Sequence, residues 1–61
     1  MTREEFKEYY ESRGWTVHEL AERWGYSAVT RIYQIAAEVE TGHKRAQAYI
    51  DMLHGLPKRK R

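Results

Sequence analysis

Residues 16–39, TVHELAERWGYSAVTRIYQIAAEV, constrain the fold more than any other stretch of the chain. Thr16 can cap a helix, and Glu19 three residues later completes the pattern of a capping box. Four apolar residues then recur at helical spacing and form one narrow face: Val17, Leu20, Ala21 and Trp24. Gly25 suits the left-handed position that ends such a helix. This half of the stretch therefore predicts a short helix that stops at Gly25.

The other half of the stretch predicts a second, longer helix, for which Ser27 is a natural N-cap. Its apolar stripe consists of Val29, Ile32, Ile35, Ala36 and Val39. Its opposite, polar side consists of Ser27, Thr30, Arg31, Gln34, Ala37 and Thr41. Two helices that each bury one face and are joined by a turn of about three residues form a helix-turn-helix. The second of them is expected over about residues 28–39.

One further helix is predicted on each side of this motif. Thr2 and Glu5 repeat the capping-box pattern, which predicts a helix from about Arg3 to Ser12. The buried stripe of that helix would be Phe6, Tyr9 and Tyr10. Near the C-terminus, apolar residues recur at i, i+3, i+4 and i+7: Ala46, Tyr49, Ile50 and Leu53. Because no alternating apolar pattern predicts a strand, the expected fold is all-α with four helices.

The length of the chain allows a single small domain. Its 61 residues predict one helical domain over residues 1–57 and a basic tail, KRKR, at residues 58–61. A chain this short buries a modest core, so Trp15 is expected to fill the junction of the first three helices, and oligomerisation is expected as well. Without cysteine or an apolar run near the roughly 18 residues of a membrane span, we expect no disulfide, no membrane segment and a cytoplasmic location.

Charge is distributed unevenly along the chain, although the net charge is only +2. Residues 1–22 carry three basic and six acidic side chains, whereas residues 23–61 carry eight basic and three acidic ones. The asymmetry predicts positive potential on the half that contains the longer helix and the tail. It favours a positioned basic face over nonspecific coating of nucleic acid.

The segment ELAERWGYS, in which Ala21 precedes Gly25 by four residues, resembles the helix-turn-helix of phage repressor and Cro-like regulators. The segment VETGHKR at residues 39–45 is similar to the loop that follows the recognition helix in that family. The resemblance covers roughly residues 1–56 and implies a small phage- or plasmid-borne repressor, similar to the regulators that accompany anti-CRISPR genes. More residues separate Gly25 from Glu40 than this family usually has there. Either the turn is longer by one residue, or the second helix is rotated and extended.

The polar side of the second helix has the side chains that a DNA-reading helix needs. Arginine pairs with the O6 and N7 atoms of guanine, glutamine pairs with N6 and N7 of adenine, and small residues allow close approach to the duplex. The predicted base-reading residues are Ser27, Thr30, Arg31, Gln34 and Ala37. An ordinary solvated helix face is the alternative interpretation.

Contacts to the phosphate backbone are expected from residues around that face, because such contacts fix register without reading sequence. The predicted set is Thr16, Tyr33, Lys44, Arg45, Lys58, Arg59, Lys60 and Arg61. Thr16 would act together with the free N–H groups that open its helix. The basic tail has an equally good alternative interpretation as a solvated terminus.

A homodimer on an inverted repeat is expected, because a single recognition helix covers only a few base pairs. The predicted interface consists of Tyr49, Met52, Leu53 and Leu56, although all four also fit the core.

Other classes of function are weaker interpretations of the same sequence. A small helical antitoxin or adaptor that uses the same face for a protein partner comes second. A binder of RNA or single-stranded DNA, which needs exposed stacking aromatics, comes third. An enzyme, a metal site, another cofactor and a small-molecule ligand are not predicted, because His18, His43 and His54 are dispersed and no nucleophile motif or phosphate loop is present.

Overall fold

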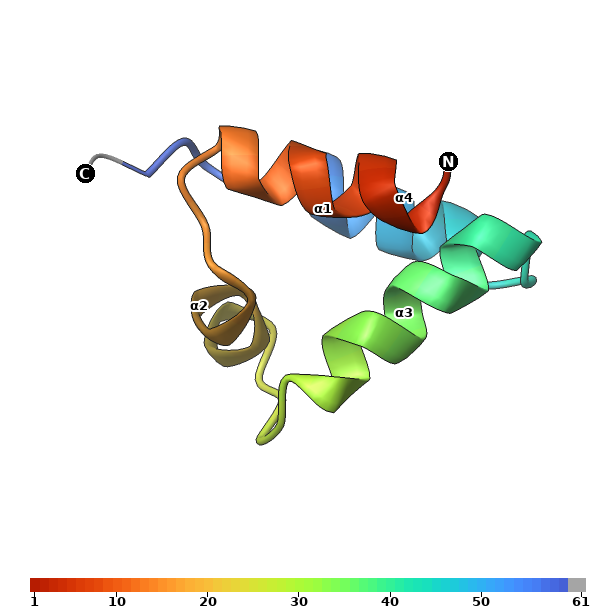
Figure 1. Cartoon of the computed structure of the whole chain (residues 1–61), viewed down its shortest axis with the longest axis horizontal. Coiled ribbons are helices and arrows are strands. Elements are labelled where there is room, and N and C mark those ends of the chain that lie inside the picture. Colours follow the sequence, from red (N-terminus) through yellow and green to blue (C-terminus); the bar gives the residue numbers. More distant parts are fainter. Residues whose placement is uncertain (60–61) are drawn as a thin grey trace.

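The computed structural model describes residues 1–59. It consists of four helices: α1 (Arg3–Ser12), α2 (Val17–Arg23), α3 (Thr30–Thr41) and α4 (Ala46–His54). Figure 1 shows α1 and α4 running in the same direction, with α3 crossing them and the short α2 at one end. No strand occurs in the described part of the chain, which confirms the all-α, four-helix prediction. None of these helices is long and apolar enough to span a bilayer.

Both predicted capping boxes are present. The Thr2 hydroxyl accepts a hydrogen bond from the backbone N–H of Glu5 (3.1 Å), and Glu5 Oε1 accepts one from the Thr2 N–H (2.8 Å). These hydrogen bonds from Thr2 lower the pKa of the exposed Glu5 carboxyl. Thr16 and Glu19 form the same reciprocal pair at the start of α2, at 3.2 and 3.0 Å. The predicted starts of the first two helices are therefore confirmed.

The connection between α2 and α3 differs from the prediction. Tyr26 N–H donates to the carbonyl of Ala21 (2.8 Å), and Gly25 has a φ of 81°, so α2 is closed by a left-handed turn. The chain then crosses to the core through residues 24–29, and Val29 precedes α3 without any side-chain cap. The prediction that Ser27 caps α3 is wrong, as is the three-residue turn. The turn is longer, but by more than the one residue expected, and α3 begins and ends two residues later than predicted.

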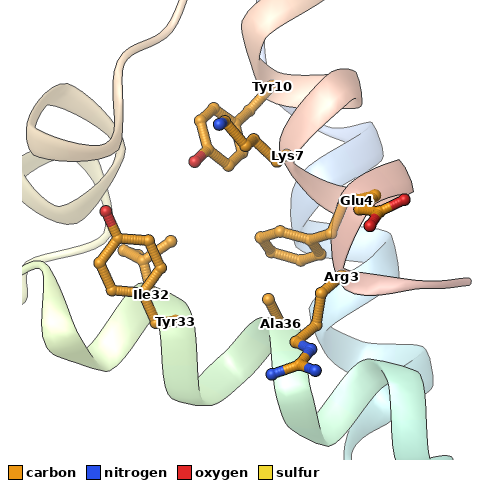
Figure 2. A pocket seen from close by; sticks show the side chains of 8 residues that line it. Arg3, Glu4, Lys7, Tyr10, Ile32, Tyr33 and Ala36 are labelled. Atoms are coloured by element: carbon orange, nitrogen blue, oxygen red, sulfur yellow. The ribbon is translucent and has the colours of Figure 1, made fainter.

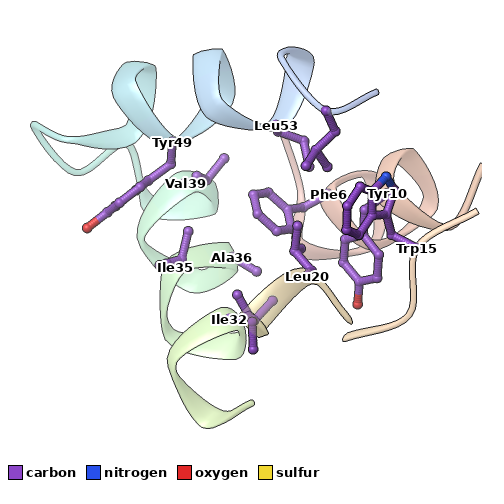
Figure 3. Close-up of a cluster of buried hydrophobic side chains, with 12 residues drawn as sticks. Phe6, Tyr10, Trp15, Leu20, Ile32, Ile35, Ala36, Val39, Tyr49 and Leu53 are labelled. Carbon is purple, nitrogen blue, oxygen red and sulfur yellow. The ribbon is translucent and has the colours of Figure 1, made fainter. Parts of the chain in front are cut away.

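The apolar stripe of α3 forms the centre of the core, because α3 contacts each of the other three helices. The buried hydrophobic residues are Phe6, Tyr10, Trp15, Leu20, Ala21, Ile32, Ile35, Ala36, Val39, Tyr49, Leu53 and Leu56. Figure 3 shows Phe6 in the middle of this cluster, and its ring packs edge-on against Tyr10 and Trp24 at centroid distances of 6.0 and 6.3 Å. Trp15 is buried at 5% exposure, as its predicted position in the junction requires.

The residues after α4 fold back along the α1–α2 link and form part of the domain. Leu56 is buried, and the Trp15 indole Nε1 donates to the carbonyl of Pro57 at 2.9 Å. Arg59 N–H donates to the carbonyl of Arg13 at 2.8 Å. The Arg59 guanidinium lies over the Trp15 ring and pairs with the Glu19 carboxylate at 3.0 Å. The prediction that the free tail starts at residue 58 is therefore wrong for Arg59.

Substitution of two glycines with left-handed backbone tests how much the residues after α4 contribute to the stability of the domain. Gly14 and Gly25 have φ values of 86° and 81°, but a Cβ added at Gly14 would lie 2.8 Å from the Arg59 carbonyl oxygen, whereas one at Gly25 meets nothing within 4 Å. We expect Gly25→Ala to lower the free energy of unfolding by about 1–2 kcal/mol. We expect Gly14→Ala to cost about 1 kcal/mol more, because it also displaces the Arg59–Arg13 hydrogen bond. Urea unfolding followed by tryptophan fluorescence measures both losses, and equal losses would contradict the expectation.

Candidate nucleic-acid interface

The side of α3 that faces away from the core consists of Thr30, Gln34, Ala37 and Thr41, and is called the outer face below. Its two threonines and its glutamine are exposed, and Ala37 is half-buried. The face is about 18 Å long, the length of a helix of 12 residues. Ser27, the remaining predicted base-reading residue besides Arg31, is exposed in the loop before α3. The outer face is therefore polar, free of bulky apolar groups and open to a partner.

Arg31 does not project from this face as predicted. Its Nη2 donates to the hydroxyl of Tyr49 on α4 at 2.9 Å, and its Nη1 donates to Gln34 Oε1 at 3.5 Å. Its guanidinium carbon lies 5.7 and 6.0 Å from the ring centroids of Tyr26 and Tyr49. Only 34% of the side chain is exposed. The guanidinium is thus held at the α4 side of the outer face by two aromatic residues that the sequence interpretation did not connect with it.

Glu38 completes this cluster from one turn further along α3. Its Oε2 lies 3.7 Å from Arg31 Nη1, a long ion pair, and the same oxygen is buried and accepts no hydrogen bond from residues 1–59. The spacing of Arg31, Gln34 and Glu38 along one side of a helix predicts their contact, but this pattern was not used in the sequence interpretation. No local pattern connects Tyr49 with Arg31, because they lie on different helices.

The other side of the outer face borders a trough between α1 and α3. Glu40 of α3 pairs with Arg3 of α1 at 3.1 Å, and Tyr33 is 56% exposed at the edge of the trough. Figure 2 shows this hollow of about 370 Å³, whose lining residues are Arg3, Glu4, Phe6, Lys7, Tyr10, Ile32, Tyr33 and Ala36. Burial raises the pKa of the Tyr10 hydroxyl, and the nearby Glu11 and Tyr33 add to the shift. The hollow has a mainly apolar wall and lies beside the outer face.

The predicted contacts to the DNA backbone are only partly available. At the anion site predicted for the start of α2, the Thr16 N–H donates to the Glu19 carboxylate and the Glu19 N–H donates to the Thr16 hydroxyl, so these two donors already have partners within the chain. The side chains of Lys44 and Arg45 are exposed directly after α3, in the loop that leads to α4, and Lys58 is exposed as well. Lys60 and Arg61 lie outside the described residues.

The predicted dimer interface is wrong for three of its four residues. Tyr49, Leu53 and Leu56 are exposed by 6% or less, because they pack in the core of their own chain, where α4 contacts α1 and α3. Met52 alone among the four stays exposed, at 38%.

The contact between α3 and α4 through Arg31 can be tested without any ligand. We expect Tyr49→Phe to lower the free energy of unfolding by about 1 kcal/mol, because it removes the acceptor of a partly buried arginine. Tyr33→Phe is the matched control, since this hydroxyl makes no hydrogen bond within residues 1–59, and a change below about 0.5 kcal/mol is expected. Urea titration of both variants gives the difference. A loss confined to Tyr33→Phe would contradict the role of Tyr49.

Within residues 1–59, no three histidine or carboxylate side chains gather in a way that could hold a metal ion. Thr30, Gln34 and Ala37 are brought together on one exposed face, whereas Ser27 lies before it and Arg31 beside it. Comparison of the chain with protein-family models, curated proteins and solved structures finds no match in any of the three.

Proposed function

We propose that this protein binds double-stranded DNA, with the outer face of α3 in the major groove and α2 and α3 acting as a helix-turn-helix with a lengthened turn. The observation that carries the proposal is the bare outer face itself. Thr30, Gln34 and Thr41 offer hydrogen-bonding groups along a helix whose opposite side is fixed in the core, and Ala37 allows close approach. A helix that enters the major groove needs this combination of small and hydrogen-bonding side chains.

Gln34 is the residue best placed to read a base. Its amide oxygen accepts from Arg31, so its amide N–H groups, which have no partner among residues 1–59, are left to donate. The major-groove edges of guanine, adenine and thymine all present acceptors for such a donor. Lys44 and Arg45, exposed at the C-terminal end of α3, would supply phosphate contacts that fix the register.

The regulator is proposed to act in the cytoplasm as a homodimer, and as a repressor of the phage or plasmid kind that the sequence resembles. A helix of about 18 Å covers only a few base pairs, so two copies on an inverted repeat are needed for a specific site. With Tyr49, Leu53 and Leu56 inside the core, the exposed side of α4 around Met52 remains as a surface for the second copy.

Selection of bound duplexes from a random library tests the proposal. We expect an enriched inverted repeat, with affinity that falls steeply as salt rises. Gln34→Ala should weaken binding to the selected site by roughly tenfold and leave random duplex unchanged, because a lost base contact costs about 1–3 kcal/mol. Ser12→Ala is the control, since Ser12 is an exposed polar residue at the end of α1 whose hydroxyl donates to the carbonyl of Tyr9, and it should change neither affinity.

Two outcomes would contradict the proposal. One is the absence of any enriched sequence. The other is binding of equal strength to all duplexes that Gln34→Ala does not alter. Retention of a protein partner at high salt by a chain that selects no DNA would favour the rival adaptor function instead, and the apolar trough beside Tyr33 would be the surface to examine.

A further inference from the structure

The two glutamates of α3 flank the outer face on opposite sides, and each is paired with an arginine. Glu40 holds Arg3 of α1 at 3.1 Å and also accepts its backbone N–H at 3.0 Å. Glu38 lies 3.7 Å from Arg31, a residue of its own helix. The first pair ties two helices together and is well formed. The second pair is long and leaves a buried carboxylate oxygen of Glu38 without a hydrogen bond from residues 1–59.

The geometry around Arg31 explains why the second pair is poorly formed. The guanidinium is drawn toward α4, where Nη2 donates to Tyr49 at 2.9 Å, and Nη1 is shared between Gln34 and Glu38. A buried carboxylate oxygen with no hydrogen bond is a costly arrangement, and the nearest compensating charge is this guanidinium. If Arg31 leaves this position, the Glu38 carboxylate loses its compensating charge, which is unfavourable. Glu38 therefore restrains Arg31.

We propose that Glu38 is a positioning residue that limits the use of Arg31 in DNA binding; this inference rests on the proposed DNA-binding function. While Glu38 is charged, Arg31 stays beside the outer face, packed on Tyr26 and Tyr49. The carboxylate also places a negative charge at the edge of a surface that approaches phosphates. A neutral residue at position 38 removes the electrostatic part of this restraint, so that the guanidinium moves more readily to a phosphate or to the acceptor edge of a guanine.

Two interactions compete for the Arg31 guanidinium. A guanidinium–phosphate contact is charge-assisted and can be bidentate, so it can offset the cost of separating Arg31 from Glu38, whose 3.7 Å ion pair is long. Arg31 lies about two turns before Glu38 and about one turn before Gln34, so a swing of its flexible side chain toward Gln34 brings the guanidinium to the outer face. Glu38 therefore determines how much binding free energy the duplex has to supply to move the Arg31 side chain.

Comparison of Glu38→Gln with Glu40→Gln tests the proposal, because both remove one negative charge from α3 but only Glu38 faces Arg31. We expect Glu40→Gln to raise affinity for a selected duplex roughly twofold through net charge alone. We expect Glu38→Gln to raise this affinity roughly three- to tenfold further. Where Arg31 then contacts one more phosphate, the slope of log affinity against log salt should become steeper by about 0.9. In an Arg31→Ala background, the two glutamine variants should become equal.

A measurement without DNA tests separately whether Glu38 restrains the Arg31 side chain. We expect the heteronuclear NOE of the Arg31 side-chain Nε–Hε group to fall in Glu38→Gln and to stay unchanged in Glu40→Gln. An unchanged NOE in Glu38→Gln overturns the inference, as do equal effects of the two variants on affinity and salt slope. If the wild-type chain selects no duplex, the proposed function fails, and the NOE comparison still supports or overturns the restraint. Circular dichroism of each variant verifies that the helices are intact.

Discussion

Burial of one side of α3 is the constraint on which the rest of the structure depends. Ile32 and Ile35 are almost completely buried, and α3 contacts every other helix, with Phe6 of α1 at the centre of the cluster (Figure 3). Rotation of α3 about its axis by a single residue would expose one of these isoleucines and bury Gln34 or Thr30 without a partner. Both changes are unfavourable. The outward direction of the polar face is therefore a consequence of packing and needs no separate cause.

A domain of this size also needs contacts between segments that are distant in sequence, because its core is small. Trp15 is the point where these contacts meet. Its ring is buried, its indole N–H bonds the carbonyl of Pro57, and the guanidinium groups of Arg23 and Arg59 approach its ring at 5.9 and 4.7 Å. The returning segment closes the open end between α1 and α2, which holds the start of α2 in place relative to the core. The position of α3 is thereby supported from the far side of the molecule.

Features that depend on neighbouring residues could be predicted from the sequence. The two capping boxes, the bounds of α1 and the left-handed backbone of Gly25 follow from spacings of a few residues. The start of α3 could not be predicted, because Ser27 has the right chemistry for a cap but Val29 packs against the core and draws the chain past it. Periodicity likewise predicted the apolar residues of α4 without deciding whether a second copy or the chain itself covers them. Arg31 shows the same limit, because its partner Tyr49 lies 18 residues further along the chain.

The outer face and the trough between α1 and α3 are not independent surfaces, since Tyr33 belongs to the edge of both. Its ring lines the hollow with Phe6 and Ile32 (Figure 2), while its position on α3 lies one residue before Gln34. A partner that fills the hollow contacts this ring and thereby lies beside the face that we propose to enter the major groove. Under the proposed function, a second copy in the hollow would compete with the duplex for the surroundings of Tyr33, so the exposed side of α4 around Met52 is the better surface for a dimer.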